Sequence, residues 1–238
     1  MFDTTAFLTD LRAEMVQCAD PAHRDGLRWF FKEAISPLGV RSSELNALVA
    51  RRWRELRTLD PAVLLQMCNT LWQSDVFEDP TLASKWCSRA VSKLGPAAFE
   101  TFEGWLSTRV NNWAHCDVLC TGCLGPLLMR HPELWERTLP WLASPNRWLR
   151  RGAAVSLVPP GRRGLFLDQV FHVADALLTD DDDLVRKGYG WMLKETSKAW
   201  PQEVLDFVLA RRARMPRVAL RYAIELMPAD WRRKAMER

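Results

Sequence analysis

The sequence predicts an all-α protein made of short helices stacked in series, and three observations carry this prediction. Prolines repeatedly precede or open segments of helical apolar periodicity, where their missing N–H and fixed φ suit a first helical turn. Alternating strand patterns with Asn-Gly or Asp-Gly turns are missing, as are the common glycine-rich phosphate loops. Helix starts at intervals of roughly 15 to 20 residues favour a repeat stack over a bundle.

The expected helix starts follow the prolines along the chain. Asp20, Asp60 and Asp79 each stand directly before a proline, where an aspartate side chain accepts hydrogen bonds from the free N–H groups of the first turn. We therefore expect these three residues to cap helices. The prolines that mark helix starts are Pro21, Pro61, Pro80, Pro96, Pro132, Pro201, Pro216 and Pro228.

Residues 60–72 illustrate the periodicity expected within these helices. Apolar side chains recur there at i, i+1, i+4, i+5 and i+8, which makes a broad stripe that must pack on neighbouring helices. The stripe consists of Val63, Leu64, Met67, Cys68 and Leu71. A different pattern occurs at residues 180–183, where four aspartates lead into a basic helix. We expect these carboxylates to lie at a positive helix N-terminus and not around a metal ion.

The length of 238 residues and the hydrophobic fraction of 48% suit one compact domain that buries a core. We expect a single α-solenoid over residues 1–238. Helix pairs recurring every ~40 residues would match HEAT-like repeats, and a stack of this kind is concave on one face. We also expect the protein to be a monomer.

Cysteine usage and hydropathy bear on the compartment. Six cysteines are too few for a disulfide scaffold, and the N-terminal residues 1–5 open acidic rather than basic and apolar. The longest apolar stretch without charge, residues 118–129, is shorter than the ~18 residues that indicate a membrane-spanning helix. We therefore expect a cytoplasmic protein without a membrane span.

Positive charge is concentrated near the C-terminus. From Arg186 onwards, 13 Lys and Arg residues face 6 Asp and Glu residues, although the net charge of the whole chain is only +4. An arginine-rich surface suits a polyanion such as nucleic acid, because each neutralised phosphate releases counterions. On charge alone, a solvated surface without a partner is the simpler interpretation. The clusters at 211–214 and 232–234 would accordingly hold distal duplex backbone or face water.

One cysteine run invites two interpretations. Cys116, Cys120 and Cys123 have the Cys-x3-Cys-x2-Cys spacing by which radical S-adenosylmethionine enzymes hold an iron–sulfur cluster. The same residues stand at i, i+4 and i+7 of a helical pattern, where small thiols behave as core residues. Because no strand-rich barrel surrounds them, we expect buried thiols without a metal or cofactor. The neighbouring His115 is expected to be a packed histidine rather than a general acid.

The most informative pair is Trp113 and Asp117, which an i, i+4 spacing places on one helix face. Three further segments follow in order: His-Pro-Glu-Leu at 131–134, Ser-Pro-Asn-Arg-Trp-Leu-Arg-Arg at 144–151 and Gly-Trp-Met-Leu-Lys-Glu-Thr-Ser-Lys at 190–198. With Pro-Leu-Gly-Val at 37–40 and Leu-Trp at 71–72, they resemble the AlkD-like DNA alkylation repair family, the HEAT-like-repeat alkylpurine DNA glycosylases. The likeness runs from about residue 27 to about residue 210.

The resemblance implies roles for the residues that match the family's motifs. It makes Asp117 the catalytic carboxylate, which stabilises positive charge on the deoxyribose as the N-glycosidic bond breaks and helps to place water. It places Trp113 and Trp191 against the lesion's sugar and backbone, where their π faces favour cationic character. Phe30 falls where a tyrosine often stands and is expected to contact the substrate without a hydroxyl.

The resemblance also implies contacts with DNA phosphates. Arg151 matches the arginine that grips backbone phosphate beside the lesion, which suits a forked guanidinium. Arg150 is expected to share or replace this role, and Lys194 is a further candidate. The chain departs from the family pattern at Asn112 and Ala114, which stand where the family commonly has tryptophan and aspartate.

The implied function is that of a DNA glycosylase. It would hydrolyse the N-glycosidic bond of positively charged N3- or N7-alkylated purines in double-stranded DNA, without flipping the base into a pocket. No metal or cofactor is implied. One alternative is a non-catalytic HEAT-like module that binds duplex or branched DNA by shape and charge. Another is a solenoid that binds only proteins.

Overall fold

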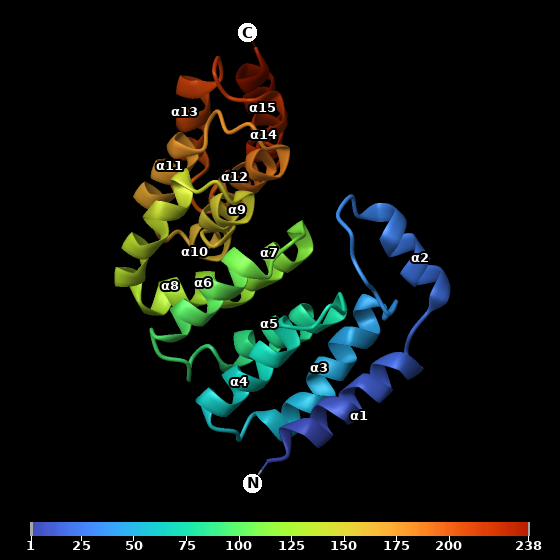
Figure 1. Ribbon diagram of the computed structural model, residues 1–238. Coiled ribbons are helices and arrows are strands. Elements are labelled where there is room, and N and C mark those ends of the chain that lie inside the picture. Colours follow the sequence, from blue (N-terminus) through green and yellow to red (C-terminus); the bar gives the residue numbers. More distant parts are fainter. Residues whose placement is uncertain (1, 238) are drawn as a thin grey trace. The chain divides into compact units, whose positions relative to one another are not determined.

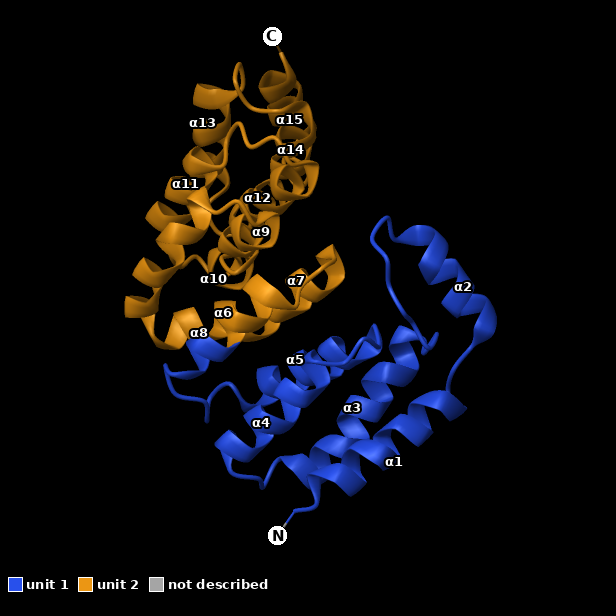
Figure 2. Cartoon of the chain, in the orientation of Figure 1, with its two compact units in different colours: residues 1–101 blue, residues 102–238 orange. Residues whose placement is uncertain are grey.

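The computed structural model describes residues 2–237, and the chain forms two compact units, residues 1–101 and 102–238 (Figure 2). The predicted all-α class is confirmed, because helices hold most of the described residues and extended pairing among them is limited to two isolated bridges. The two units are described each by itself. The single concave solenoid over residues 1–238 therefore stays a prediction.

The helices of the first unit can be followed from blue to green in Figure 1. The sixth of them continues into the second unit. They are α1 (Thr4–Gln17), α2 (Pro21–Phe30), α3 (Ser42–Leu56), α4 (Pro61–Trp72), α5 (Glu78–Ala90) and α6 (Ala98–Thr108).

Two of the three predicted aspartate caps in this unit are confirmed. Asp20 accepts from the backbone N–H groups of the α2 first turn at 2.9 and 3.2 Å, and Asp60 accepts from the first turn of α4 at 2.8 Å. The prediction for Asp79 is wrong, because α5 begins at Glu78 and thus ahead of it. Asp79 is fully buried and forms an ion pair with Arg12 instead.

The turn at residues 37–40 is held by a carboxylate from α5. Glu78 accepts hydrogen bonds from the backbone N–H groups of Leu38, Gly39 and Val40 at 3.0, 2.8 and 3.1 Å. Gly39 has φ +97°, and a Cβ there would lie 2.4 Å from the carbonyl oxygen of Asp20. This turn therefore needs glycine for both its conformation and its space.

The predicted apolar stripe of α4 is confirmed in all but one position. The buried residues are Leu64, Met67, Cys68 and Leu71. Val63, the first residue of the stripe, is 38% exposed. Tryptophans elsewhere in the chain also differ in burial. Trp72, Trp86 and Trp141 are buried, and Trp53 and Trp135 are half-buried.

The second unit contains shorter helices, including one π-helical and one 3₁₀ segment, η1 and η2. Prolines again open η2 and α13, and they directly precede α14 and α15. The elements are α7 (Trp113–Leu119), η1 (Cys120–Leu124), α8 (Gly125–Arg130), η2 (Pro132–Ala143), α9 (Arg147–Val155), α10 (Val158–Arg162), α11 (Leu167–Ala176), α12 (Asp183–Thr196), α13 (Pro201–Arg211), α14 (Arg217–Ala223) and α15 (Ala229–Met236).

Helix α12 is the centre of this unit, because it packs against α9, α10, α11 and α14. Two of its glycines allow close approach. A Cβ at Gly190 would lie 2.8 Å from Cβ of Tyr222 and 2.9 Å from the carbonyl oxygen of Ala219 on α14. A Cβ at Gly188 would lie 3.3 Å from Cγ of Arg151 on α9.

Among the described residues, no helix is both long and apolar enough to cross a membrane.

Candidate functional site

Helix α7 presents the residues that the sequence singled out. It begins after Asn112, whose Oδ1 accepts from the backbone N–H of His115 at 3.0 Å. Trp113 and Asp117 follow as an i, i+4 pair on the half-exposed side of this helix. The asparagine that departs from the family pattern is thus the buried cap of the helix that carries Asp117.

His115 is packed, as predicted. The residue is only 4% exposed, and its Nδ1 lies 2.9 Å from Nδ2 of Asn112. An amide nitrogen can only donate, so Nδ1 is the acceptor in this hydrogen bond. This buried histidine is not placed to protonate a leaving group in solvent.

The three cysteines of the run are core residues. Cys116, Cys120 and Cys123 are fully buried on α7 and the π-helical turn η1. The Sγ of Cys116 donates to the carbonyl oxygen of Trp148 at 3.8 Å, and burial raises the pKa of this thiol well above its usual value. Within residues 2–237, no cluster of three or more His, Cys, Asp or Glu residues is arranged to hold a metal ion.

Asp117 forms a bidentate ion pair with Arg151 of α9. Nε of Arg151 donates to Oδ1 at 2.9 Å, and Nη2 donates to Oδ2 at 2.8 Å. A third donor of the guanidinium, Nη1, binds the carbonyl oxygen of Leu184 in the first turn of α12. The Arg151 side chain is 7% exposed and that of Asp117 is 18% exposed. The carboxylate is therefore oriented by a buried cation while part of it still reaches solvent.

The ionisation of Asp117 is set by two opposing effects. Burial raises the pKa of its carboxyl, because a charge is less stable away from water. The nearby guanidinium of Arg151 opposes that rise, both by its charge and by its hydrogen bonds. The two hydrogen bonds from a guanidinium that always remains charged favour the ionised carboxylate and so limit the rise.

Trp191 lies on α12, one turn after Gly188, which contacts Arg151 of α9. Gly188 contacts the Arg151 side chain, and Leu184 accepts its hydrogen bond, so one face of α12 lies against this arginine. Residues 184, 188 and 191 share that face, because they are spaced by i, i+4 and i+7. Trp191 is half-exposed there. The second unit thus joins Asp117 of α7, Arg151 of α9 and Leu184 of α12 through hydrogen bonds.

The role of Arg151 as a contact to DNA phosphate stays a prediction, and in this structure its guanidinium faces Asp117 and not solvent. The physical reason is that a buried arginine must be paired, and Asp117 together with a backbone carbonyl provides the partners. Lys194 likewise has a partner, since its Nζ lies 3.0 Å from Oε1 of Glu225 and its side chain is 19% exposed.

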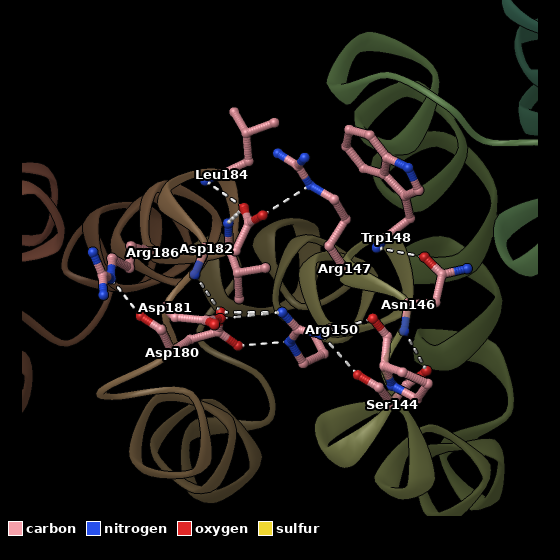
Figure 3. Close-up of polar contacts among 12 residues, drawn as sticks. Ser144, Asn146, Arg147, Trp148, Arg150, Asp180, Asp181, Asp182, Leu184 and Arg186 are labelled. Carbon is pink, nitrogen blue, oxygen red and sulfur yellow. Dashed lines mark hydrogen bonds and ion pairs between the residues drawn. The ribbon is translucent and has the colours of Figure 1, made fainter. Parts of the chain in front are cut away.

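Arg150 is also engaged within the protein, as Figure 3 shows. Its Nε donates to Asp180 at 2.7 Å, and its Nη1 donates to the carbonyl oxygen of Ser144 at 2.8 Å. These contacts fix the loop before α9 to the loop before α12. None of the three cations expected to grip phosphate is left pointing at solvent without a partner.

The acidic run at 180–183 behaves as predicted. Asp182 caps α12, accepting from the N–H groups of Leu184 and Val185 at 2.8 and 3.2 Å, and it also pairs with Arg147 at 2.9 Å (Figure 3). Asp183 pairs with Lys187 at 2.7 Å. The carboxylates therefore lie at a helix N-terminus and in ion pairs.

Phe30 lies apart from these residues in the chain, at the end of α2 in the first unit. It is 61% exposed and contacts Phe31 edge to face, with 5.4 Å between ring centroids. Its role as a substrate contact stays a prediction.

Sequence reasoning missed two features of the site. One is the Asp117–Arg151 pair itself, for which no local signal exists because 34 residues separate the partners. The other is Gly188, which gives the Arg151 side chain room against α12. A glycine inside an otherwise helical pattern was a usable signal, because it costs helix stability and so indicates a packing or functional reason.

Comparison with known proteins places this arrangement in context. A family model described as "DNA alkylation repair enzyme" matches residues 11–227. A predicted DNA alkylation repair enzyme from Enterococcus faecalis has a similar structure, with a TM-score of 0.77, 18% identity, and coverage of 89% of this chain and 97% of that one. AlkD2 from Streptococcus mutans gives a TM-score of 0.57 at 17% identity and covers 78% and 100% of the two chains. No curated protein matches the sequence.

Proposed function

Because the chain belongs to the DNA alkylation repair enzyme family, we propose that it is a DNA glycosylase for alkylated purines. Its substrate would be double-stranded DNA that carries positively charged N3- or N7-alkylpurines. The reaction would be hydrolysis of the N-glycosidic bond, which releases the free base and leaves an abasic site. The base would leave without being drawn into a pocket, as the resemblance to the AlkD-like enzymes implies.

The observation that carries this proposal is the carboxylate of Asp117, held in place by Arg151. A carboxylate has about four lone-pair sites, and the bidentate arginine takes two of them. The remaining sites belong to a side chain that still reaches solvent. They are available to stabilise positive charge on the deoxyribose and to accept a hydrogen bond from the attacking water.

The tryptophans and the choice of substrate fit the same chemistry. Trp113 shares the α7 face of Asp117, and Trp191 follows Gly188 on the face of α12 that contacts Arg151. Aromatic faces at such a place favour a cationic sugar and exclude water. With His115 buried, leaving-group protonation has no evident donor. A purine that already carries positive charge does not need one, whereas a neutral lesion does.

The test is an excision assay with an Asp117→Asn variant. Released methylpurine is measured from duplex DNA treated with a methylating agent. The variant should lose excision by about 10²-fold or more, roughly 3 kcal/mol, because the neutral amide cannot stabilise the sugar cation. Binding of undamaged duplex should stay close to the parent value.

The control variant is Asp183→Asn, which removes one carboxylate from an exposed ion pair at the start of α12. It should excise at the parent rate. If Asp117→Asn released methylpurine as fast as the parent while still binding DNA, the glycosylase assignment would fail and the non-catalytic DNA-binding module would replace it.

A further inference from the structure

A surface pocket of the second unit lies between α14 and α15, and Asp117 is not among the residues that line it. It has a volume of about 470 Å³. Its apolar part includes Ile224, which is 3% exposed. Its polar part consists of Arg221, Arg232, Arg233 and Glu225. We call these residues the C-terminal arginine pocket.

The three arginines of this pocket are exposed and have no carboxylate partner within the described chain. In this they differ from the phosphate-binding candidates at the first site, each of which has a carboxylate partner. The single acid of the pocket is already occupied, because Glu225 pairs with Lys194 at 3.0 Å. The pocket therefore presents three uncompensated positive charges around an apolar floor.

Other arginines hold the pocket in shape. Nη1 of Arg212 donates to the carbonyl oxygen of Lys234 at 2.6 Å, and Nη2 of Arg217 donates to the carbonyl oxygen of Met236 at 3.2 Å. Both bonds satisfy carbonyl groups that would otherwise be free at the C-terminal end of α15. Arg212 and Arg217 therefore hold α15 in place, whereas the three arginines of the pocket have no carboxylate partner among the residues that the structure describes.

The pocket is connected to the Asp117 site through α12. Trp191 and Lys194 are one turn apart on that helix, and the Lys194–Glu225 ion pair joins it to the pocket. The close packing at Gly190 holds α14 against α12. A polyanion that lies across Trp191 and continues over this ion pair would reach the three free arginines next.

We propose that the C-terminal arginine pocket binds backbone phosphates of duplex DNA that flank the lesion on one side. Forked guanidinium groups suit phosphate oxygens, and the apolar floor at Ile224 suits the carbons of a deoxyribose. The choice of DNA as the ligand rests on the proposed function. The pocket acts as an anchor that is independent of the excision chemistry.

The experiment measures binding to unmodified duplexes by fluorescence anisotropy over a series of salt concentrations, with the Arg232→Ala/Arg233→Ala variant. On a duplex of about 20 base pairs, affinity should fall about tenfold and the slope of log K against log salt should flatten by about 1 to 2 units. A duplex of about 10 base pairs, one helical turn, offers fewer phosphates than one that reaches both the Asp117 site and the pocket, so the loss on it should be smaller.

Two control variants separate the pocket from charge in general. Arg232→Lys/Arg233→Lys keeps the charges and should keep most of the salt slope. Arg130→Ala/Arg163→Ala removes two exposed arginines from the ends of α8 and α10 in the same unit and should leave both duplexes bound as before. If the double variant folds poorly, Arg221→Ala on α14 replaces it, and it should also lower the affinity for the longer duplex.

Equal losses from the pocket variant and from Arg130→Ala/Arg163→Ala would overturn the proposal, as would an unchanged slope. Displacement of DNA from the pocket by polyglutamate at equal charge would instead indicate a site for acidic protein segments. Because unmodified duplex is used, these results do not depend on excision. If the excision assay failed but the salt slope still depended on the pocket arginines, the proposed anchor would stand. If excision were normal but the slope did not depend on these arginines, the proposed anchor would be wrong.

Discussion

At the scale of single residues, the chemistry of the site depends on how Asp117 keeps its charge. Burial raises the pKa of this carboxyl, and Arg151 opposes the rise. The pairing also makes Arg151 a positioning residue, since it fixes both carboxylate oxygens while it holds the start of α12. Its loss would leave a buried carboxylate without its cation, which typically costs about 3–5 kcal/mol of stability.

The resulting prediction concerns the pH dependence of excision. The folded-state pKa of Asp117 is raised, so the active ionised form is lost as pH falls through a range above the ordinary aspartate value. In Arg151→Met the opposing cation is gone, and the acidic limb of the rate profile should move to higher pH. Arg151→Lys, which keeps a charge, should move it less.

The rate should be recorded from pH about 4 to about 8 with methylated duplex, alongside thermal unfolding to confirm a folded variant. Arg163→Met serves as the control, because that exposed arginine contacts Met129 and not the site. An acidic limb that stays at the parent pH in Arg151→Met would show that the pair does not set the ionisation of Asp117.

At the scale of elements, the close packing of α12 decides where the site's parts lie. Gly188 gives room to Arg151 of α9 and Gly190 allows α14 to come close, so the packing of α9 and α14 against α12 depends on these two glycines. Protein interiors tolerate an added methyl group poorly when the nearest atoms belong to backbone. The Asp117 site and the C-terminal arginine pocket are therefore both built on helices that pack against α12.

We predict opposite effects for two glycine-to-alanine changes. Gly190→Ala should lower the free energy of unfolding by about 1–3 kcal/mol, because the new Cβ meets backbone of α14 below 3.0 Å. Gly104→Ala within α6 meets nothing within 4 Å and should raise stability by about 0.4–1 kcal/mol through the unfolded state. Denaturant unfolding measures both, and equal effects of the two changes would contradict the packing argument.

At the scale of the whole chain, its six thiols divide sharply by exposure. Five are buried, and only Cys18 is half-buried, at the end of α1. The buried set includes the run at Cys116, Cys120 and Cys123, whose spacing allowed a cluster-binding interpretation. Packed thiols of this kind react slowly because reagents need the exposed thiolate.

Thiol labelling tests this division. In the native protein, an aromatic disulfide reagent should modify Cys18 rapidly and the other cysteines only as the chain unfolds. The Cys18→Ser variant should therefore show almost no fast phase, and denaturant should restore reactivity at the five remaining thiols. A rapid phase in native Cys18→Ser would contradict the burial of the run. About one metal ion per chain by elemental analysis would contradict the expectation that these cysteines hold no metal.

Much of the fold and part of the site follow from the sequence by local rules. Proline positions and cap chemistry act within one turn, so they correctly predicted the starts of α2, α4 and α13 and the caps at Asp20 and Asp60. Helical spacing likewise placed Trp113 and Asp117 together on α7. The same rules failed at Asp79, where a long-range ion pair with Arg12 in the core takes the place of a cap.

The sequence by itself determined the helical class, several helix starts and the shared face of Trp113 and Asp117, because each depends on residues a few positions apart. Only the tertiary structure decided the partners of the charged side chains. Arg151 turns to Asp117 and Lys194 to Glu225, across 34 and about 30 residues, since burial requires each cation to find a carboxylate on whichever helix lies beside it. That requirement depends on which helices become neighbours, and no local spacing contains it.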